Sequence, residues 1–150
     1  MKIKIIEANI EQLDIIMELF NQYMIFYKKP SNETKYKAYL KERIEKNETT
    51  IFLALNSENI PLGFVLNYYS FSSVSLGKTI TLNDLFVKSE YRKKGIAEKL
   101  INKTFDLAKK NGAIRVDLGT AKDNYTAQKL HERIGFVKDE EYFAYSYSIK

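Results

Sequence analysis

The stretch EYRKKGIA, residues 90–97, joins a predicted strand over 79–87 to a helical repeat of apolar residues that begins at Gly95. The N-terminus of a helix presents unpaired backbone N–H groups and the positive end of the helix dipole, an arrangement that binds phosphate. Gly95 lets the backbone approach an anion, and the small side chain of Ala97 leaves the first turn uncrowded. Three bases add positive charge at the same point: Arg92, Lys93 and Lys94. The stretch therefore predicts a phosphate-binding loop.

The positive charge of the chain is concentrated around this loop. The 150 residues include 24 Lys or Arg and 19 Asp or Glu, a net charge of +5, and the segment 88–110 holds the whole excess with eight bases and three acids. A localised positive field attracts a phosphate-bearing ligand or a nucleic acid, whereas a solvated helix face with exposed lysines is the simpler interpretation. The loop matches neither the Walker pattern GxxxxGKS/T nor GxGxxG, which argues against an NTPase or an NAD enzyme.

Outward from the loop, the apolar residues follow strand and helix periods in turn. Predicted strands cover 2–6, 50–55, 61–69, 79–87 and 114–118, and the aromatic alternation predicts one or two more over 136–149. Predicted helices cover 10–27, 31–46, 95–110 and 124–134, with Asn9 and either Ser31 or Asn32 as N-caps, and Asn111-Gly112 and Gly135 as stops. Because no repeat or linker interrupts this order, we expect one mixed α/β domain over residues 1–150.

The composition excludes several kinds of protein and site. Apolar residues make up 45% and charged residues 29%, so the chain is neither disordered nor fibrous. With no cysteine, disulfides, thiolate metal sites and cysteine nucleophiles are excluded, and with a single histidine and no carboxylate cluster we expect no metal. No run approaches the roughly 18 apolar residues of a membrane span. Since no signal segment is evident either, we expect a cytoplasmic protein with no membrane partner.

Several stretches together resemble the GNAT superfamily of N-acetyltransferases. Strand, then Arg-x-x-Gly-x-Ala, then helix is similar to the pyrophosphate-binding loop of that family, and LNDLFV (82–87) looks like the strand that enters it. A second signature is similar at NYTA (124–127) and LHERIGF (130–136). The resemblance implies a mixed, mostly antiparallel central sheet flanked by helices, with a splayed strand pair that binds acetyl-CoA. YSFSS (69–73), LNDLFV and EYFAY (141–145) look like the branch with polyamine, histone and D-amino-acid acetyltransferases.

The resemblance also implies which residues hold acetyl-CoA. Backbone groups near the point where the two strands separate would pair with the pantetheine arm and the acetyl carbonyl, while the apolar side chains there remain ordinary core. Asn124, Ala127 and His131 share one face of the last predicted helix, from which Asn124 would reach the same arm. The implied cofactor-binding residues are Leu85, Phe86, Val87, Arg92, Lys93, Lys94, Gly95, Ile96, Ala97, Asn124, Ala127 and His131.

Three residues are candidates for the chemistry of acetyl transfer. Asp84 is a charged residue within an apolar strand, which is costly unless it is partnered or functional. It is a base for the amine, an anchor for a cationic substrate, or a structural carboxylate bonded to backbone N–H groups. Asn83 stands where polyamine-type relatives often have a glutamate base, and it could position a water. His131 stands where the family usually has the tyrosine that protonates the leaving thiolate; it is either a donor to the sulfur or an exposed helix histidine.

The acceptor predicted by this resemblance is a small primary amine, either a polyamine or an amino acid. The pocket for this amine is expected between the first two helices and the C-terminal strands. Aromatic residues from the first predicted helix, and from the strand predicted over 61–69 and the residues just after it, are expected to line this pocket. The predicted substrate residues are Tyr27, Tyr69, Phe71 and Asp84, with Tyr23 and Phe26 nearby.

Three alternatives to a small-molecule enzyme remain open at this stage. The first is a lysine acetyltransferase that acts on proteins, and the second is an acyl-CoA-binding protein without catalysis. The third is a nucleic-acid-binding module, but the bases gather at one strand–helix junction, so we expect a compact phosphate ligand and no nucleic acid. Exposed edges of the terminal strands suggest a homodimer.

Overall fold

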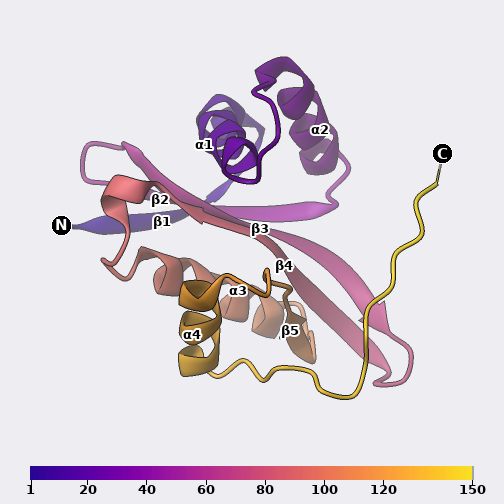
Figure 1. Cartoon of the computed structure of the whole chain (residues 1–150). Helices are drawn as coiled ribbons and strands as arrows, with labels where there is room; N and C mark the ends of the chain where they lie inside the picture. Colours follow the sequence, from indigo (N-terminus) through magenta and orange to yellow (C-terminus); the bar gives the residue numbers. More distant parts are fainter. Residues whose placement is uncertain (150) are drawn as a thin grey trace. The chain divides into compact units, whose positions relative to one another are not determined.

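The computed structural model describes residues 1–149 and contains a five-stranded sheet with its strands in chain order (Figure 1). The strands are β1 (Ile3–Ala8), β2 (Thr49–Asn56), β3 (Pro61–Ser72), β4 (Gly77–Val87) and β5 (Arg115–Asp117). Neighbours from β1 to β4 pair antiparallel, and β5 is parallel to β4. The predicted mixed, mostly antiparallel sheet is therefore confirmed, and each of these five strands lies where the apolar pattern predicted it.

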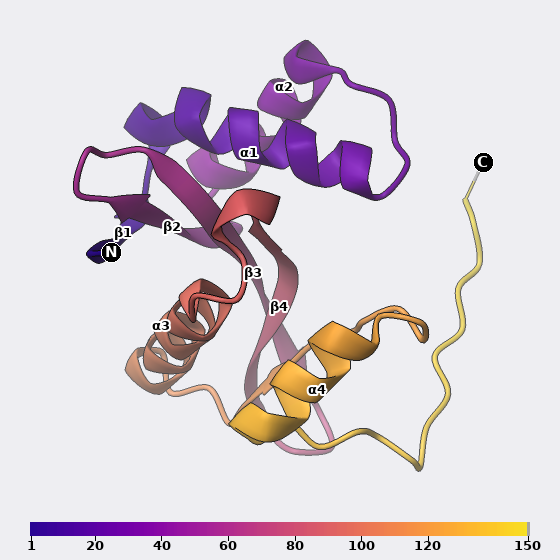
Figure 2. The ribbon, with the colours of Figure 1, turned by 60° about the vertical axis from the view of Figure 1, so that its left-hand side comes forward.

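Helices cover both faces of this sheet. On one face lie α1 (Leu13–Phe26) and α2 (Glu33–Glu45), and on the other lies α3 (Ile96–Lys110), as Figure 2 shows from a second direction. Two predicted N-caps are confirmed: Asn9 forms a capping box with Gln12 at a short 3-10 turn before α1, and Asn32 accepts from the N–H of Lys35 at α2. These caps satisfy backbone donors that a helix leaves unpaired.

The alternation of β3 supplies a core on each face of the sheet. Leu66 packs with buried apolar side chains of α1 and α2, including Phe20 and Leu40. Asn67, the next residue, is fully buried on the α3 side, where it accepts from Thr104 Oγ1 at 3.0 Å and donates to the Thr50 carbonyl at 3.2 Å. A β-bulge between Leu66 and Asn67 shifts the register of β3 against β4.

Pairing between β4 and β5 is short. Among the described residues, β5 pairs with β4 over Thr79–Thr81, so the part of β4 from Leu82 to Val87 continues beyond the end of that ladder. Backbone N–H and C=O groups on such an unpaired strand edge are available to another extended molecule. This is the place where the resemblance predicted separated strands.

The chain divides into two compact units, one over Met1–Gly119 and one from Thr120 onward. The second unit contains α4 (Tyr125–Ile134), with Asn124 as its N-cap and Gly135 after its last turn at φ +125°, as predicted. The strands predicted over 136–149 are wrong, because the structure describes neither helix nor strand in that range. The alternation is present, with Phe143, Tyr145 and Tyr147 each 88% exposed or more, but a strand also requires a hydrogen-bonded neighbour.

Candidate active site

The loop between β4 and α3 is fastened to the end of β4 by Arg92. Its Nε donates to the Val87 carbonyl oxygen at 2.8 Å. Its guanidinium carbon lies 5.5 Å from the ring centroid of Phe26 and 5.7 Å from that of Phe86. Cation–π contacts and a hydrogen bond to a carbonyl both restrict the side chain, so Arg92 fixes the direction in which the loop leaves the strand.

The backbone of the loop leaves the N-terminus of α3 open to an anion. Lys93 and Gly95 both take left-handed conformations, with φ +62° and +79°. Gly95 is the N-cap of α3 and provides no side-chain cap, and a Cβ at this position would meet no atom within 4 Å. Lys93, Lys94 and Gly95 are exposed, while Ile96 is buried and anchors the first turn. Uncapped N–H groups, open space and adjacent cations suit the phosphates of a ligand.

Asp84 is a buried carboxylate with two side-chain donors. It is 9% exposed, Tyr23 Oη donates to its Oδ1 at 2.6 Å, and Asn83 Nδ2 donates to its Oδ2 at 3.1 Å. Burial raises the pKa of Asp84 above its ordinary value, and the two hydrogen bonds only partly oppose this effect. The pKa of Tyr23 is also raised, first by burial and then by the Asp84 charge, so the phenol stays a donor. Asp84 is therefore a stronger base than an exposed aspartate.

Aromatic side chains connect Asp84 with the loop. The ring centroid of Tyr23 lies 6.1 Å from that of Phe86 and 4.8 Å from that of Tyr27. Arg92 packs on the ring of Phe86 as well, so the carboxylate and the anion-binding loop lie along one side of β4. The backbone of Leu85 to Val87, which has passed the end of the β5 ladder, lies between them.

The predicted substrate residues do not form one group. The ring of Tyr27, 48% exposed, is tilted against that of Tyr23, and Tyr23 in turn donates to Asp84, so the end of α1 brings Tyr27 close to β4. Tyr69 lines a cavity at the end of α2, described below, and Phe71 lies farther along β3 at 74% exposure. The structure also adds residues that sequence reasoning missed, because Arg43, Glu48 and Tyr68 line the same cavity as Tyr69.

The residues predicted on α4 lie in the second unit. Asn124 uses its Oδ1 to accept from the Ala127 N–H at 3.2 Å, which makes it a helix cap. His131 is 8% exposed and its ring lies 5.7 Å from that of Phe136, so the interpretation of an exposed helix histidine is wrong. Its Nδ1 is buried without a hydrogen-bond partner among residues 1–149, and burial lowers its pKa below the ordinary value. A buried, unpartnered imidazole nitrogen is costly in a purely structural side chain.

No group of three or more His, Cys, Asp or Glu side chains within residues 1–149 is placed to hold a metal ion. In the same range, no helix combines the length and the apolar character needed to cross a membrane.

Comparison with known proteins identifies the family of this chain. The family model described as the acetyltransferase (GNAT) family matches residues 13–136. The chain belongs to this family. It is 35% identical over 143 residues to an uncharacterized N-acetyltransferase, YhfO, of Bacillus subtilis (strain 168), with 95% of each chain covered. A crystal structure of a probable acetyltransferase, 36% identical, matches with a TM-score of 0.92 over 98% of both chains.

A third relative is more distant and has a named substrate. The chain is 24% identical over 145 residues to the thialysine N-epsilon-acetyltransferase of Caenorhabditis elegans, covering 95% of this chain and 89% of that protein. The predicted GNAT fold and the prediction of an enzyme are thus confirmed, and the protein is a GNAT-type acetyltransferase. The narrower resemblance to polyamine, histone and D-amino-acid acetyltransferases stays a prediction.

Proposed function

We propose that this acetyltransferase transfers the acetyl group of acetyl-CoA to a primary amine of a small molecule, by direct attack in a ternary complex. The observation that carries this proposal is the buried Asp84 carboxylate, held by Tyr23 and Asn83 on the strand that leads into the loop. Asp84 is thus a base of raised pKa, and it lies next to the part of β4 that extends past its pairing with β5. A relative that acts on an amino-acid amine, thialysine, supports a small acceptor.

The residues of the loop fit the phosphates of acetyl-CoA. The left-handed Gly95 and the uncapped first turn of α3 would receive the pyrophosphate, with the exposed Lys93 and Lys94 beside it. Backbone groups of Leu85 to Val87 would pair with the pantetheine arm, since this part of β4 extends past the β5 ladder. The full set proposed to hold the cofactor is the one predicted from the sequence: 85–87, 92–97, Asn124, Ala127 and His131.

Each candidate residue has a definite part in the proposed transfer. Bound acetyl-CoA supplies an acetyl thioester, whose C–S bond breaks as the acceptor nitrogen forms the C–N bond. Asp84 takes a proton from the acceptor ammonium, directly or through a water that Asn83 positions. Tyr23 keeps the carboxylate in place through its hydrogen bond. The second proton that the nitrogen loses on becoming an amide goes to the departing sulfur, which leaves as the free thiol. His131, neutral because of its lowered pKa, stabilises the departing thiolate by donating an N–H hydrogen bond.

The direct test is release of thiol from acetyl-CoA in the presence of different amines. The panel contains polyamines, D- and L-amino acids, aminoglycosides and lysine-containing peptides. Turnover with one class of small amine supports the proposal and identifies the acceptor. Turnover with peptides alone would instead favour a protein lysine acetyltransferase, and binding of CoA without turnover would favour a non-catalytic protein.

The homodimer expected from the sequence is tested separately by sedimentation.

Tyr23→Phe is expected to move the acidic limb of the activity profile to higher pH. Removing the phenol donor destabilises the ionised form of Asp84, so the raised pKa of this carboxylate rises further. A hydrogen bond to a charged group contributes about 1.5–3 kcal/mol, which corresponds to a shift of about 1–2 pH units. The measurement is kcat/KM as a function of pH. A limb at the same pH in both proteins would show that Asp84 is not the group that titrates.

His131→Phe is expected to lower turnover more than it lowers cofactor affinity. Phenylalanine resembles the ring in size but has no N–H to donate, so only the step in which the thiolate leaves should suffer, by on the order of 100-fold in kcat. The readouts are kcat with saturating acetyl-CoA and the Kd of CoA by calorimetry. Equal turnover in the two proteins would remove His131 from the chemistry.

A further inference from the structure

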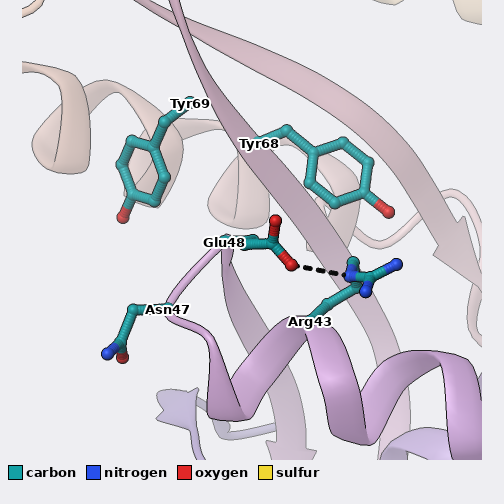
Figure 3. Close-up of a pocket in the computed structure, with 5 residues that line it drawn as sticks. All are labelled: Arg43, Asn47, Glu48, Tyr68 and Tyr69. Carbon is teal, nitrogen blue, oxygen red and sulfur yellow. Dashed lines mark hydrogen bonds and ion pairs between the residues drawn. The ribbon is translucent and has the colours of Figure 1, made fainter.

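Opposite charges line a cavity of about 470 Å³ at the C-terminal end of α2. Arg43, Asn47 and Glu48 come from the end of α2 and the turn into β2, and Tyr68 and Tyr69 come from β3 (Figure 3). Arg43 Nε donates to Glu48 Oε1 at 3.0 Å. Sites for small molecules commonly have volumes of about 300–1,000 Å³. This cavity is therefore large enough for a metabolite of amino-acid size.

In the ion pair of this cavity, the Glu48 side chain is free to move away, whereas the Arg43 side chain is held by other contacts. The Glu48 side chain is 50% exposed, and pairs of this kind contribute only about 0–1 kcal/mol, so a ligand can replace one partner at low cost. Arg43 has additional contacts, because its Nη2 lies 3.0 Å from Glu42 Oε2 and its guanidinium lies 4.9 Å from the ring centroid of Tyr39. The guanidinium thus stays in place when Glu48 turns to a ligand.

Tyr68 and Tyr69 form walls of the cavity next to the ion pair, and hydrogen bonds hold both side chains in place. Tyr68 Oη lies 2.7 Å from Tyr39 Oη, and Tyr69 Oη is hydrogen-bonded to Thr50 Oγ1. In Figure 3 Glu48 lies below and between the two rings, and Arg43 lies below the ring of Tyr68. Because both hydroxyls are engaged, the rings offer apolar surface and π faces, which suit an aliphatic chain and an ammonium group.

The cavity lies within reach of Asp84 along the sheet. Leu66 of β3 is paired with Asp84, and Tyr68 is two residues farther along β3, a distance of about 7 Å at the usual rise of a strand. The pKa of Tyr68 is raised by burial, by Tyr39 and by the charge of Asp84, while the Arg43 charge acts in the opposite direction. The Tyr68 phenol therefore interacts electrostatically with both the carboxylate of Asp84 and the guanidinium of Arg43.

We propose that this cavity binds the α-carboxylate and α-ammonium groups of an amino-acid acceptor whose side-chain amine reaches Asp84. Arg43 takes the carboxylate with its planar fork, and Glu48 takes the ammonium between the rings of Tyr68 and Tyr69. A diamine fits this lining less well, because its second ammonium would pair with Glu48 and leave the Arg43 guanidinium facing a like charge. The inference rests on the proposed function, in which Asp84 receives the proton of the reacting amine.

The test compares acceptors that differ in a single charged group. L-Lysine is compared with its methyl ester and with cadaverine, which both lack the carboxylate, and L-ornithine serves as a shorter amino acid. We expect kcat/KM for the amino acid to exceed that for either counterpart without the carboxylate by about 10- to 100-fold, the usual range for a hydrogen bond to a charged group. Arg43→Gln should remove this preference by lowering only the value for the amino acid, and Arg43→Lys should restore part of it.

Two further variants keep the test decisive. Lys46→Gln also removes a cation that pairs with Glu42, but Lys46 does not line the cavity, so its acceptor preference should match that of the wild type. If Arg43→Gln fails to fold, Glu48→Gln tests the other half of the site, since it should lower the preference for lysine over aminocaproate, which lacks the α-ammonium.

The two proposals fail in different ways. Acetylation of amines with the same preference in wild type and Arg43→Gln would overturn the cavity proposal and leave the proposed function standing. Absence of thiol release with every amine would contradict the proposed function instead. In that case the cavity proposal is tested by calorimetry, with lysine titrated into the CoA-bound protein. Binding of lysine that Arg43→Gln abolishes supports the cavity proposal, and binding that is absent, or unchanged in Arg43→Gln, overturns it.

Discussion

Gly95→Glu is expected to abolish binding of coenzyme A while the protein remains folded. The substituted carboxylate would lie at the N-terminus of α3, where the open space around Gly95 is proposed to receive the pyrophosphate. Like charges in contact cost several kcal/mol, which corresponds to a loss of affinity of about 100-fold or more. The measurement is the Kd of CoA by calorimetry, with circular dichroism as the check on folding.

Gly112→Glu is the matched control for this variant. Gly112 follows the other end of α3, also has a left-handed backbone at φ +68°, and also has open space around its Cα. Both substitutions place a glutamate in the same strained backbone conformation, at a cost of roughly 1–2 kcal/mol. The two sites are about 22 Å apart along a 15-residue helix, at 1.5 Å per residue. Unchanged affinity in Gly95→Glu, or an equal loss in Gly112→Glu, would contradict the loop assignment.

Features that depend on neighbouring residues were predictable from the sequence. The loop over 90–97 is contiguous, so its glycine, its bases and its position before a helix could all be interpreted together. The N-caps Asn9, Asn32 and Asn124 bond to groups two or three residues away, which is why their side-chain chemistry was informative. The burial of Asp84 also followed from a short pattern, a charge among apolar strand residues.

Features that depend on distant residues were not predictable. One of the two donors to Asp84 is Tyr23, 61 positions earlier, and only the packing of α1 on the sheet brings the two together. Arg43 and Glu48 lie at the end of a helix in the sequence, and the tyrosines that complete their cavity belong to another element. The alternation over 136–149 predicted strands from side chains alone, whereas a strand also needs a partner, which local sequence does not specify.

Asp84→Asn is expected to lower turnover strongly and to raise stability at neutral pH. Asparagine cannot take a proton from the acceptor, and loss of a general base usually costs about 100- to 10,000-fold in rate. The amide can still accept from Tyr23, and Asn83 can turn its own amide to accept from the new N–H, so the local bonds survive. The assay is kcat with saturating acceptor. The control is Asp14→Asn, which alters an exposed carboxylate on α1 and should leave kcat unchanged.

The change in stability caused by Asp84→Asn separates a catalytic carboxylate from a structural one. Because the pKa of Asp84 is raised in the folded state, the folded protein favours the protonated acid; that contribution to stability is complete below the ordinary pKa and is lost as the pH rises through the raised one. At neutral pH the buried charge therefore destabilises the fold, and Asp84→Asn should melt at a higher temperature, with a difference that disappears in acid. A structural carboxylate would behave in the opposite way, since its removal would lower the melting temperature along with the activity. A protein that retains a residue at the expense of its own stability, and loses turnover when that residue is neutralised, uses it for chemistry.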